Sequence, residues 1–137
     1  MKAKKGFTLI ELLAVIVILA IIALITVPVV IKIINNAKKG AAEDSAYGVV
    51  ESAKLFWASN QGNFENTNSE VVFECHDTKI CDTDDITGLT GTAAQLDISG
   101  TKPTAGTITI NNGEVTVTGL VFGEYTCATN DGKIACN

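Results

Sequence analysis

The chain contains no arginine and only one histidine, His76. Its ten basic residues are all lysines and stand against 15 acidic residues, which gives a formal net charge of -5. A protein that grips a phosphate backbone needs a basic surface, so this composition argues against nucleic-acid binding. No Ser/His/Asp catalytic arrangement can be argued from the surroundings of this single histidine. We therefore expect no enzyme.

Charge is also missing from the whole of Leu12–Ile31. Twenty such residues can cross a bilayer core of roughly 30 Å at about 1.5 Å per residue. A secretory signal has a shorter apolar core, of about 7–15 residues, followed by a small-x-small cleavage site, which is not found here. We therefore expect a membrane anchor. Lysines lie on both sides of it, Lys2, Lys4 and Lys5 before and Lys32, Lys38 and Lys39 after, so charge sets the orientation only weakly.

Two residues in this apolar helix call for an explanation. The carboxylate of Glu11 would cost about 2.5–3.5 kcal/mol at the bilayer centre and less near the interface, so it is either paired, functional, or directed towards the headgroups. Pro28 lacks a backbone N–H and is predicted to kink or loosen the helix.

Four cysteines, all beyond the anchor, suggest an exported, oxidising compartment. Four cysteines allow three pairings, and the sequence alone does not choose among them; four reduced thiols are the alternative. Their spacing is not that of a zinc site.

His76 lies near Asp77, Asp82, Asp84 and Asp85, but without a calcium-loop spacing. The glycines of Thr87–Gly91 have no phosphate-loop lysine beside them. We expect no metal and no cofactor.

Beyond the anchor the apolar positions keep helical spacing up to Trp57. They are Ala42, Ala46, Val49, Val50, Ala53, Phe56 and Trp57. One helix is therefore predicted from about Phe7 to about Ser59, ending at Asn60-Gln61-Gly62. Its second half should be buried against a small domain.

Residues 61–105 are predicted to be a loop region with two short elements, a strand at Val71–Phe73 and a helical turn at Thr92–Leu96. Residues 106–137 alternate more clearly. The expected strands are Thr107–Ile110 and Val115–Thr118 around the turn Asn111-Asn112-Gly113, then Leu120–Cys127 and Lys133–Cys136 around Asn130-Asp131-Gly132. The sequence thus predicts an α+β fold, with an antiparallel sheet of about three or four strands packed on the helix.

The segment KKGFTLIELL, Lys4–Leu13, resembles the processing site of type IV prepilins with short leaders. The resemblance covers about residues 4–31. It implies cleavage after Gly6 by a membrane-embedded prepilin peptidase, which then N-methylates Phe7. It also makes Glu11 the conspicuous glutamate at the fifth position of the mature chain, and it places a proline, here Pro28, late in the anchor.

The same resemblance implies a division of the chain into a leader at 1–6, a hydrophobic assembly helix at 7–34 and a globular domain at 35–137, in a ladle-shaped pilin fold. A bridge between Cys127 and Cys136 would resemble the disulfide-bounded C-terminal region of type IV pilins. Cys75 and Cys81 would close a small loop in the middle region.

The function implied is that of a structural subunit, first a single-pass protein of the cytoplasmic membrane in contact with lipid, then part of a surface filament. Its partners would be further copies of itself, the peptidase and the assembly machinery. Three alternatives stay open: a pseudopilin of a type II secretion or DNA-uptake machine, a tethered binding module that never polymerises, and a DNA receptor, which the lack of a basic surface argues against.

Overall fold

The computed structural model describes residues 6–63, 70–78, 80–83 and 94–137. It falls into two compact units, Met1–Ala37 and Lys38–Asn137. Helix α1, Leu9–Asn60, contributes to both units. The predicted helix from Phe7 to Ser59 is therefore confirmed to within two residues at each end, and the α+β class is confirmed as well.

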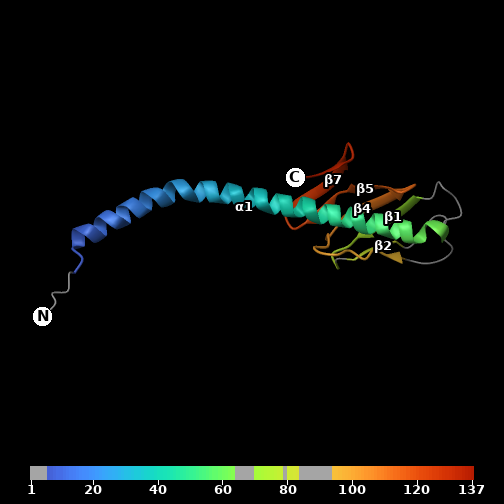
Figure 1. Cartoon of the computed structure of the whole chain (residues 1–137), viewed down its shortest axis with the longest axis horizontal. Helices are drawn as coiled ribbons and strands as arrows, with labels where there is room; N and C mark the ends of the chain where they lie inside the picture. The colour runs from blue at the N-terminus through green and yellow to red at the C-terminus, as the bar shows by residue number, and fades with distance from the viewer. Residues whose placement is uncertain (1–5, 64–69, 79, 84–93) are drawn as a thin grey trace. The chain divides into compact units, whose positions relative to one another are not determined.

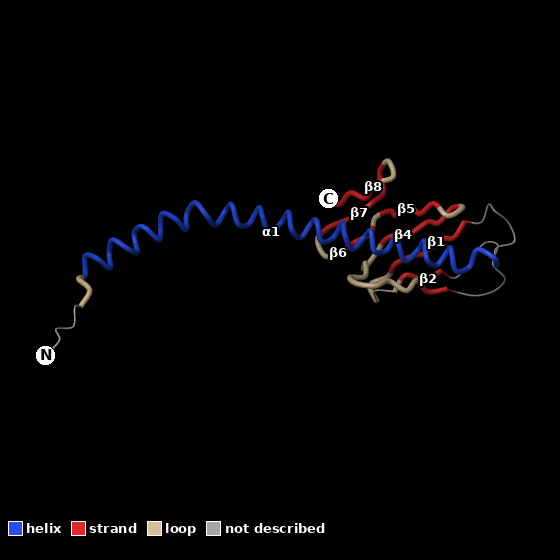
Figure 2. The backbone as a smooth tube through the Cα atoms, viewed as in Figure 1, coloured by secondary structure: helices blue, strands red, loops and turns tan. Residues whose placement is uncertain are grey.

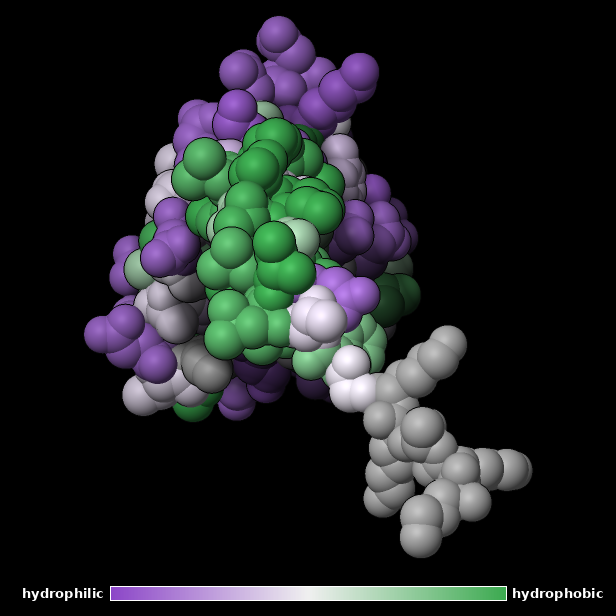
Figure 3. All heavy atoms as spheres, turned by 90° about the vertical axis from the view of Figure 1, so that its left-hand side faces the viewer, coloured by the Kyte–Doolittle hydropathy of each residue, from purple (hydrophilic) through white to green (hydrophobic). Residues whose placement is uncertain are grey.

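The first unit, the segment expected to be an anchor, is an apolar helix that no other described part of the chain covers. Its large apolar side chains, from Phe7 to Ile34, are 46–86% exposed. Figure 3 looks at the molecule from the anchor end and shows this apolar surface in green. Among the described residues, α1 is the helix long and apolar enough to cross a membrane, judged by length and composition.

Helix α1 continues through Pro28 without a break. Its course between Leu9 and Ala37 is curved rather than straight (Figure 2). The hydroxyl of Thr26 donates to the carbonyls of Ile22, at 3.0 Å, and Ala23, at 3.4 Å, and such back-bonding bends helices. A helix break at Pro28 thus stays a prediction about the filament, where neighbouring copies would pack against this turn.

In the second unit the helix lies over two antiparallel sheets (Figure 1). The first has the order β3-β2-β1-β4-β5 and the second the order β6-β7-β8. Their strands are β1 Glu70–Cys75, β2 Cys81–Thr83, β3 Ala94–Gln95, β4 Gly106–Asn111, β5 Glu114–Thr118, β6 Leu120–Phe122, β7 Tyr125–Asn130 and β8 Lys133–Cys136. A short 3-10 turn, η1 Gln61–Asn63, follows the helix.

The buried face of the helix is the one that the periodicity predicts. Its buried apolar residues are Ala42, Ala46, Val49, Val50 and Ala53. Because most of these side chains are small, the helix can approach the sheet closely. Phe73 of β1 is fully buried beneath it and meets the ring of Phe56 edge-on, with centroids 5.0 Å apart.

Both predicted turns in the last third are confirmed. Asn112 and Gly113 have φ of 49° and 86°, and Asp131 and Gly132 have φ of 49° and 76°. Positive φ at both central residues is the condition for a two-residue hairpin whose twist matches that of its strands. These turns set the register of β4 with β5 and of β7 with β8.

Three details of the sequence prediction are wrong. The strands form two sheets rather than one of three or four strands, because the middle region supplies β1, β2 and β3. The segment Leu120–Cys127 is not one strand: Gly123, at φ 63°, turns the chain between β6 and β7. The helical turn at Thr92–Leu96 is instead strand β3 at Ala94–Gln95, while Thr92 lies outside the described residues.

Two disulfides staple neighbouring strands. Cys75 is bonded to Cys81 and Cys127 to Cys136, and each pair is directly opposite in its ladder, with Cα atoms 4.0 Å apart. The residues flanking each pair carry the ladder hydrogen bonds, so the cysteines occupy non-hydrogen-bonded positions, where side chains lie closest. All four side chains are buried.

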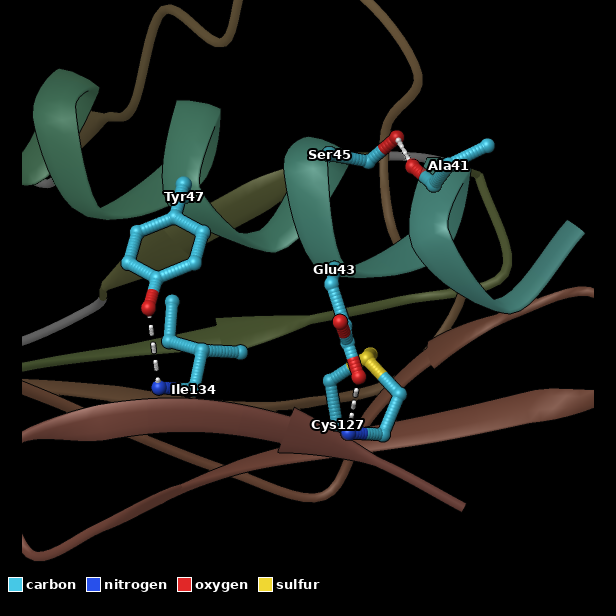
Figure 4. Close-up of a disulfide and its surroundings, with 7 residues drawn as sticks. Ala41, Glu43, Ser45, Tyr47, Cys127 and Ile134 are labelled. Carbon is cyan, nitrogen blue, oxygen red and sulfur yellow. Dashed lines mark hydrogen bonds between the residues drawn. A yellow bond between two sulfur atoms is a disulfide. The ribbon is translucent and has the colours of Figure 1, made fainter. Parts of the chain in front are cut away.

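The outer edge of β8 is covered by side chains of the helix. Asn137 and Thr126 exchange backbone hydrogen bonds, so the N–H groups of Ile134 and Cys136 point away from β7. These two N–H groups donate to the Tyr47 hydroxyl and to Glu43 Oε1, both at 3.4 Å. Figure 4 shows both side chains reaching from the helix to the C-terminal strands.

The spacing of this helix-to-strand contact follows from the two geometries. Two residues along a strand rise about 6.8 Å, and four residues along a helix rise about 6 Å. Side chains one helical turn apart therefore match alternate N–H groups of a strand that runs alongside. We call Glu43 and Tyr47 the edge latch, since they stand where another strand would bind.

Removing either latch residue should loosen β8. Tyr47→Phe and Glu43→Ala each delete one acceptor, and we expect each to cost about 0.5–1.5 kcal/mol. The measurement is hydrogen–deuterium exchange of the full chain in detergent, which should quicken at Ile134 for the first variant and at Cys136 for the second. Asp44→Ala, which removes an exposed carboxylate from the same turn, is the matched control. Unchanged exchange in both latch variants would contradict the assignment.

Candidate functional site

The first described residues, Gly6 to Thr8, form a short non-helical stretch that leads into α1. Phe7 is 86% exposed. A Cβ added to Gly6 would meet nothing within 4 Å, and its φ is not in the left-handed region. Among the described residues, therefore, nothing covers the Gly6–Phe7 bond and nothing requires a glycine at position 6.

Thr8 and Glu11 cap the N-terminus of α1 through reciprocal hydrogen bonds. The Thr8 N–H donates to Glu11 Oε2 at 2.8 Å, and the Glu11 N–H donates to Thr8 Oγ1 at 3.3 Å. The Thr8 hydroxyl also donates to Glu11 Oε2, at 2.7 Å. This reciprocal arrangement is a capping box, in which residues three apart satisfy N–H groups that have no partner inside the helix.

The capping box leaves half of the carboxylate available. All the hydrogen bonds that Glu11 accepts within the described residues go to Oε2, and the side chain is exposed. One carboxylate can thus cap its own helix through Oε2 and receive a cation through Oε1. Helix capping alone would also justify a glutamate here, so the two roles need to be separated by experiment.

Sequence reasoning singled out Gly6, Phe7 and Glu11 but missed Thr8. The signal was present, since threonine followed three residues later by glutamate, ahead of an apolar run, is the sequence pattern of a capping box. The structure brings Thr8 and Glu11 together one turn beyond the Gly6–Phe7 bond. Pro28 lies elsewhere, late in the apolar segment of α1.

Comparison with known families decides what this N-terminal segment is. Residues 1–27 match the family model of the prokaryotic N-terminal methylation motif. The chain carries the type IV prepilin signature. No curated protein and no solved structure matches the chain.

The prepilin signature accounts for the arrangement at the N-terminus. It supports a precursor of the type IV pilin or pseudopilin kind, which is a structural rather than a catalytic class. It also implies processing by a prepilin peptidase and a general assembly machinery. The apolar helix that follows fits a membrane-anchored precursor.

The weaker candidate, the acids around His76, does not assemble into a metal site in the described part of the chain. His76 Nε2 lies 3.2 Å from Asp82 Oδ1, and both side chains are about half exposed. Among the described residues, no group of three or more His, Cys, Asp or Glu side chains is placed to hold a metal ion. Asp84 and Asp85 lie outside the described residues, as does the glycine-containing stretch Thr87–Gly91.

Proposed function

We propose that this chain is a filament subunit of the type IV pilin class that polymerises with further copies through its N-terminal helix. The observation that carries the proposal is the Glu11 carboxylate, set at the start of an otherwise apolar and wholly exposed anchor, one helical turn from the Gly6–Phe7 bond.

The physical argument begins with cleavage. Hydrolysis of the Gly6–Phe7 bond leaves an amine on Phe7, which remains cationic after N-methylation. In a bundle of anchors that amine and Oε1 of Glu11 in a neighbour would compensate each other, whereas either charge alone would be expensive to bury. Because the pair needs one defined offset between helices, it would also fix the axial register of the subunits.

The proposed contact between the Phe7 amine and Glu11 also assigns a role to each remaining part of the chain. The leader at 1–6 would be removed, residues 7–34 would form the assembly helix, and residues 35–137 would form the outward-facing domain. Without the leader the chain carries seven lysines against 15 acidic residues, a net charge of -8, which suits a solvated outer surface. The mature protein would reside at the cell surface, where adhesion, motility or aggregation are roles for such a filament.

Two measurements test the proposal together. Mass spectrometry of the exported protein should find the leader missing and one methyl group on Phe7. Electron microscopy with an antibody against residues 62–137 should decorate surface filaments along their length. An unprocessed, single-pass protein would refute the proposal, and processed protein confined to short periplasmic or envelope assemblies would favour the pseudopilin alternative.

Processing itself can be tested at position 6. A bulky side chain there, as in Gly6→Leu, should block cleavage and leave the six-residue leader and an unmethylated Phe7 in the membrane fraction. Gly6→Ala is the graded control and should still be cut. A Cβ at position 6 would meet no described atom within 4 Å, so a difference between the two variants is expected to report on the peptidase. Normal cleavage of Gly6→Leu would contradict the assigned site.

A further inference from the structure

The second unit has an apolar groove that the proposed filament would fill. We infer that this groove, which we call the shoulder groove, receives apolar side chains from the anchor helix of a second copy of the chain. The inference rests on the proposed function for the existence of the filament, but it goes further, because it names the surface of the outer domain against which a neighbouring anchor packs.

The shoulder groove lies where the helix enters the second unit, beside the hairpin of β6 and β7. Its volume is about 380 Å³, which falls within the range of ligand pockets in proteins. It is lined by Lys38, Ala41, Ala42, Ser45, Thr101, Phe122, Gly123, Glu124 and Tyr125. Phe122 and Tyr125 supply aromatic surface, and the helix supplies only small side chains apart from Lys38.

Small residues on the helix are what a second helix needs for close approach. Ala41 and Ser45 are one turn apart, and neither side chain reaches far from the backbone; the Ser45 hydroxyl is turned back to the Ala41 carbonyl at 2.7 Å. That hydrogen bond satisfies the serine within its own helix, so burying it against an apolar partner leaves no hydroxyl without a partner. Interfaces between apolar helices favour such positions.

The anchor helix of a second copy is the segment that would need this groove. Helices that are apolar all round are buried on every side, and each anchor is exposed along its whole length in the single chain. Outside a membrane, other anchors can cover the sides that face the filament axis, but the outward sides need apolar surface from the outer domains. Elsewhere in the described part of the second unit, the large apolar side chains that are exposed are Tyr47, Leu55 and Val72.

The position of the groove along the helix agrees with this. Lys38 follows Ile34, the last large apolar residue of the anchor, by one helical turn, or about 6 Å. The lining of the groove therefore begins about one turn after the last large apolar residue of the first unit, counted along α1. Lys38 and Glu124 contribute charges to its lining, in keeping with the polar rim around the apolar centre of an interface.

Filling the groove is the first test. Ala41 is exposed and helical, so Ala41→Trp should fold and insert into the membrane but occupy the groove itself. We expect the filament yield, normalised to processed protein in the membrane, to fall by about tenfold or more, since overpacking an interface by a large side chain readily exceeds one decade of affinity. Ala58→Trp, which is exposed on the same helix but outside the groove, should leave the yield near that of the parent. Equal yields from the two variants would overturn the inference.

Direct contact is the second test. A benzoylphenylalanine placed at Thr101, which is exposed and lines the groove, would be photolysed in filaments that mix isotopically light and heavy chains. Adducts between Thr101 of one chain and residues 7–34 of another would support the inference. Adducts to lipid, or solely to the outer domain of another copy, would overturn it. If the parent chain is processed but forms no filament at all, the proposed function is refuted, and the groove inference, which depends on a second copy, is refuted with it. Filaments without these adducts would refute the groove inference alone.

Discussion

Glu11→Ala should abolish filament assembly while the protein remains processed and inserted in the membrane. The variant removes the proposed acceptor for the Phe7 amine of a neighbour, and that amine would then be buried without compensation. Breaking one partner of a buried pair costs about 3–5 kcal/mol, which corresponds to a loss of roughly two to three and a half decades in the affinity of each subunit contact. Filament yield by shearing and sedimentation, with the membrane pool as reference, measures the effect.

The capping box makes a sharper version of this experiment possible. Glutamine serves as well as glutamate at the third position of a helix, so Glu11→Gln keeps the bond from Thr8 but has no charge. If charge compensation drives assembly, the glutamine variant should fail as completely as the alanine variant. Asp44→Ala, an exposed carboxylate on the same helix, should assemble normally. If Glu11→Gln formed filaments at the parental yield, Glu11 would act only as a helix cap, and its charge would have no role in assembly.

The second large effect is expected at Gly106→Ala, which should prevent the second unit from folding stably. Gly106 has φ of 116°, and a Cβ there would lie 2.5 Å from the Gly119 carbonyl oxygen and 2.7 Å from the Leu120 Cα. This is where the two sheets meet, since the Val121 N–H donates to the Ala105 carbonyl at 3.0 Å. Because the clash is with backbone, relief requires the sheets to separate.

The expected loss of more than about 3 kcal/mol is a large part of the stability of a small domain. Thermal unfolding of the full chain in detergent, together with protease resistance of the second unit, measures it. Gly123→Ala also places alanine at positive φ, 63°, but in open space, so it should cost only about 1–2 kcal/mol. Gly40→Ala, inside the helix and also in open space, should stabilise by roughly 0.5–1 kcal/mol. Equal melting of the first two variants would contradict the clash.

Sequence reasoning succeeded where the determining interactions are local. The long helix was predictable because Leu12–Ile31 is apolar and without charge and because Ala42, Ala46 and Val49 repeat at helical spacing. The β4–β5 hairpin was visible because Asn112 and Gly113 accept the positive φ that its turn requires. In each case the signal lies within one element or one turn.

It failed where pairing joins distant parts of the chain. Strand β1 pairs with β4, from Glu70 opposite Asn111 to Cys75 opposite Gly106, and nothing local to either strand encodes that choice. The extra turn at Gly123 was hidden because Leu120–Cys127 is apolar enough to pass for one strand. Thr8 was missed for another reason. Its capping-box pattern with Glu11 is present in the sequence, but Glu11 was interpreted only as a charge in an apolar helix.

The edge latch has a consequence for any crowded array of this domain. An open strand edge tends to add a strand from whatever chain lies nearby, and identical copies held side by side would be the most persistent source. Glu43 and Tyr47 occupy the two outward N–H groups of β8, so this edge offers a neighbouring copy no donors to bind. In the filament proposed above, this edge would therefore not start edge-to-edge strand pairing between copies, a kind of association that has no defined end.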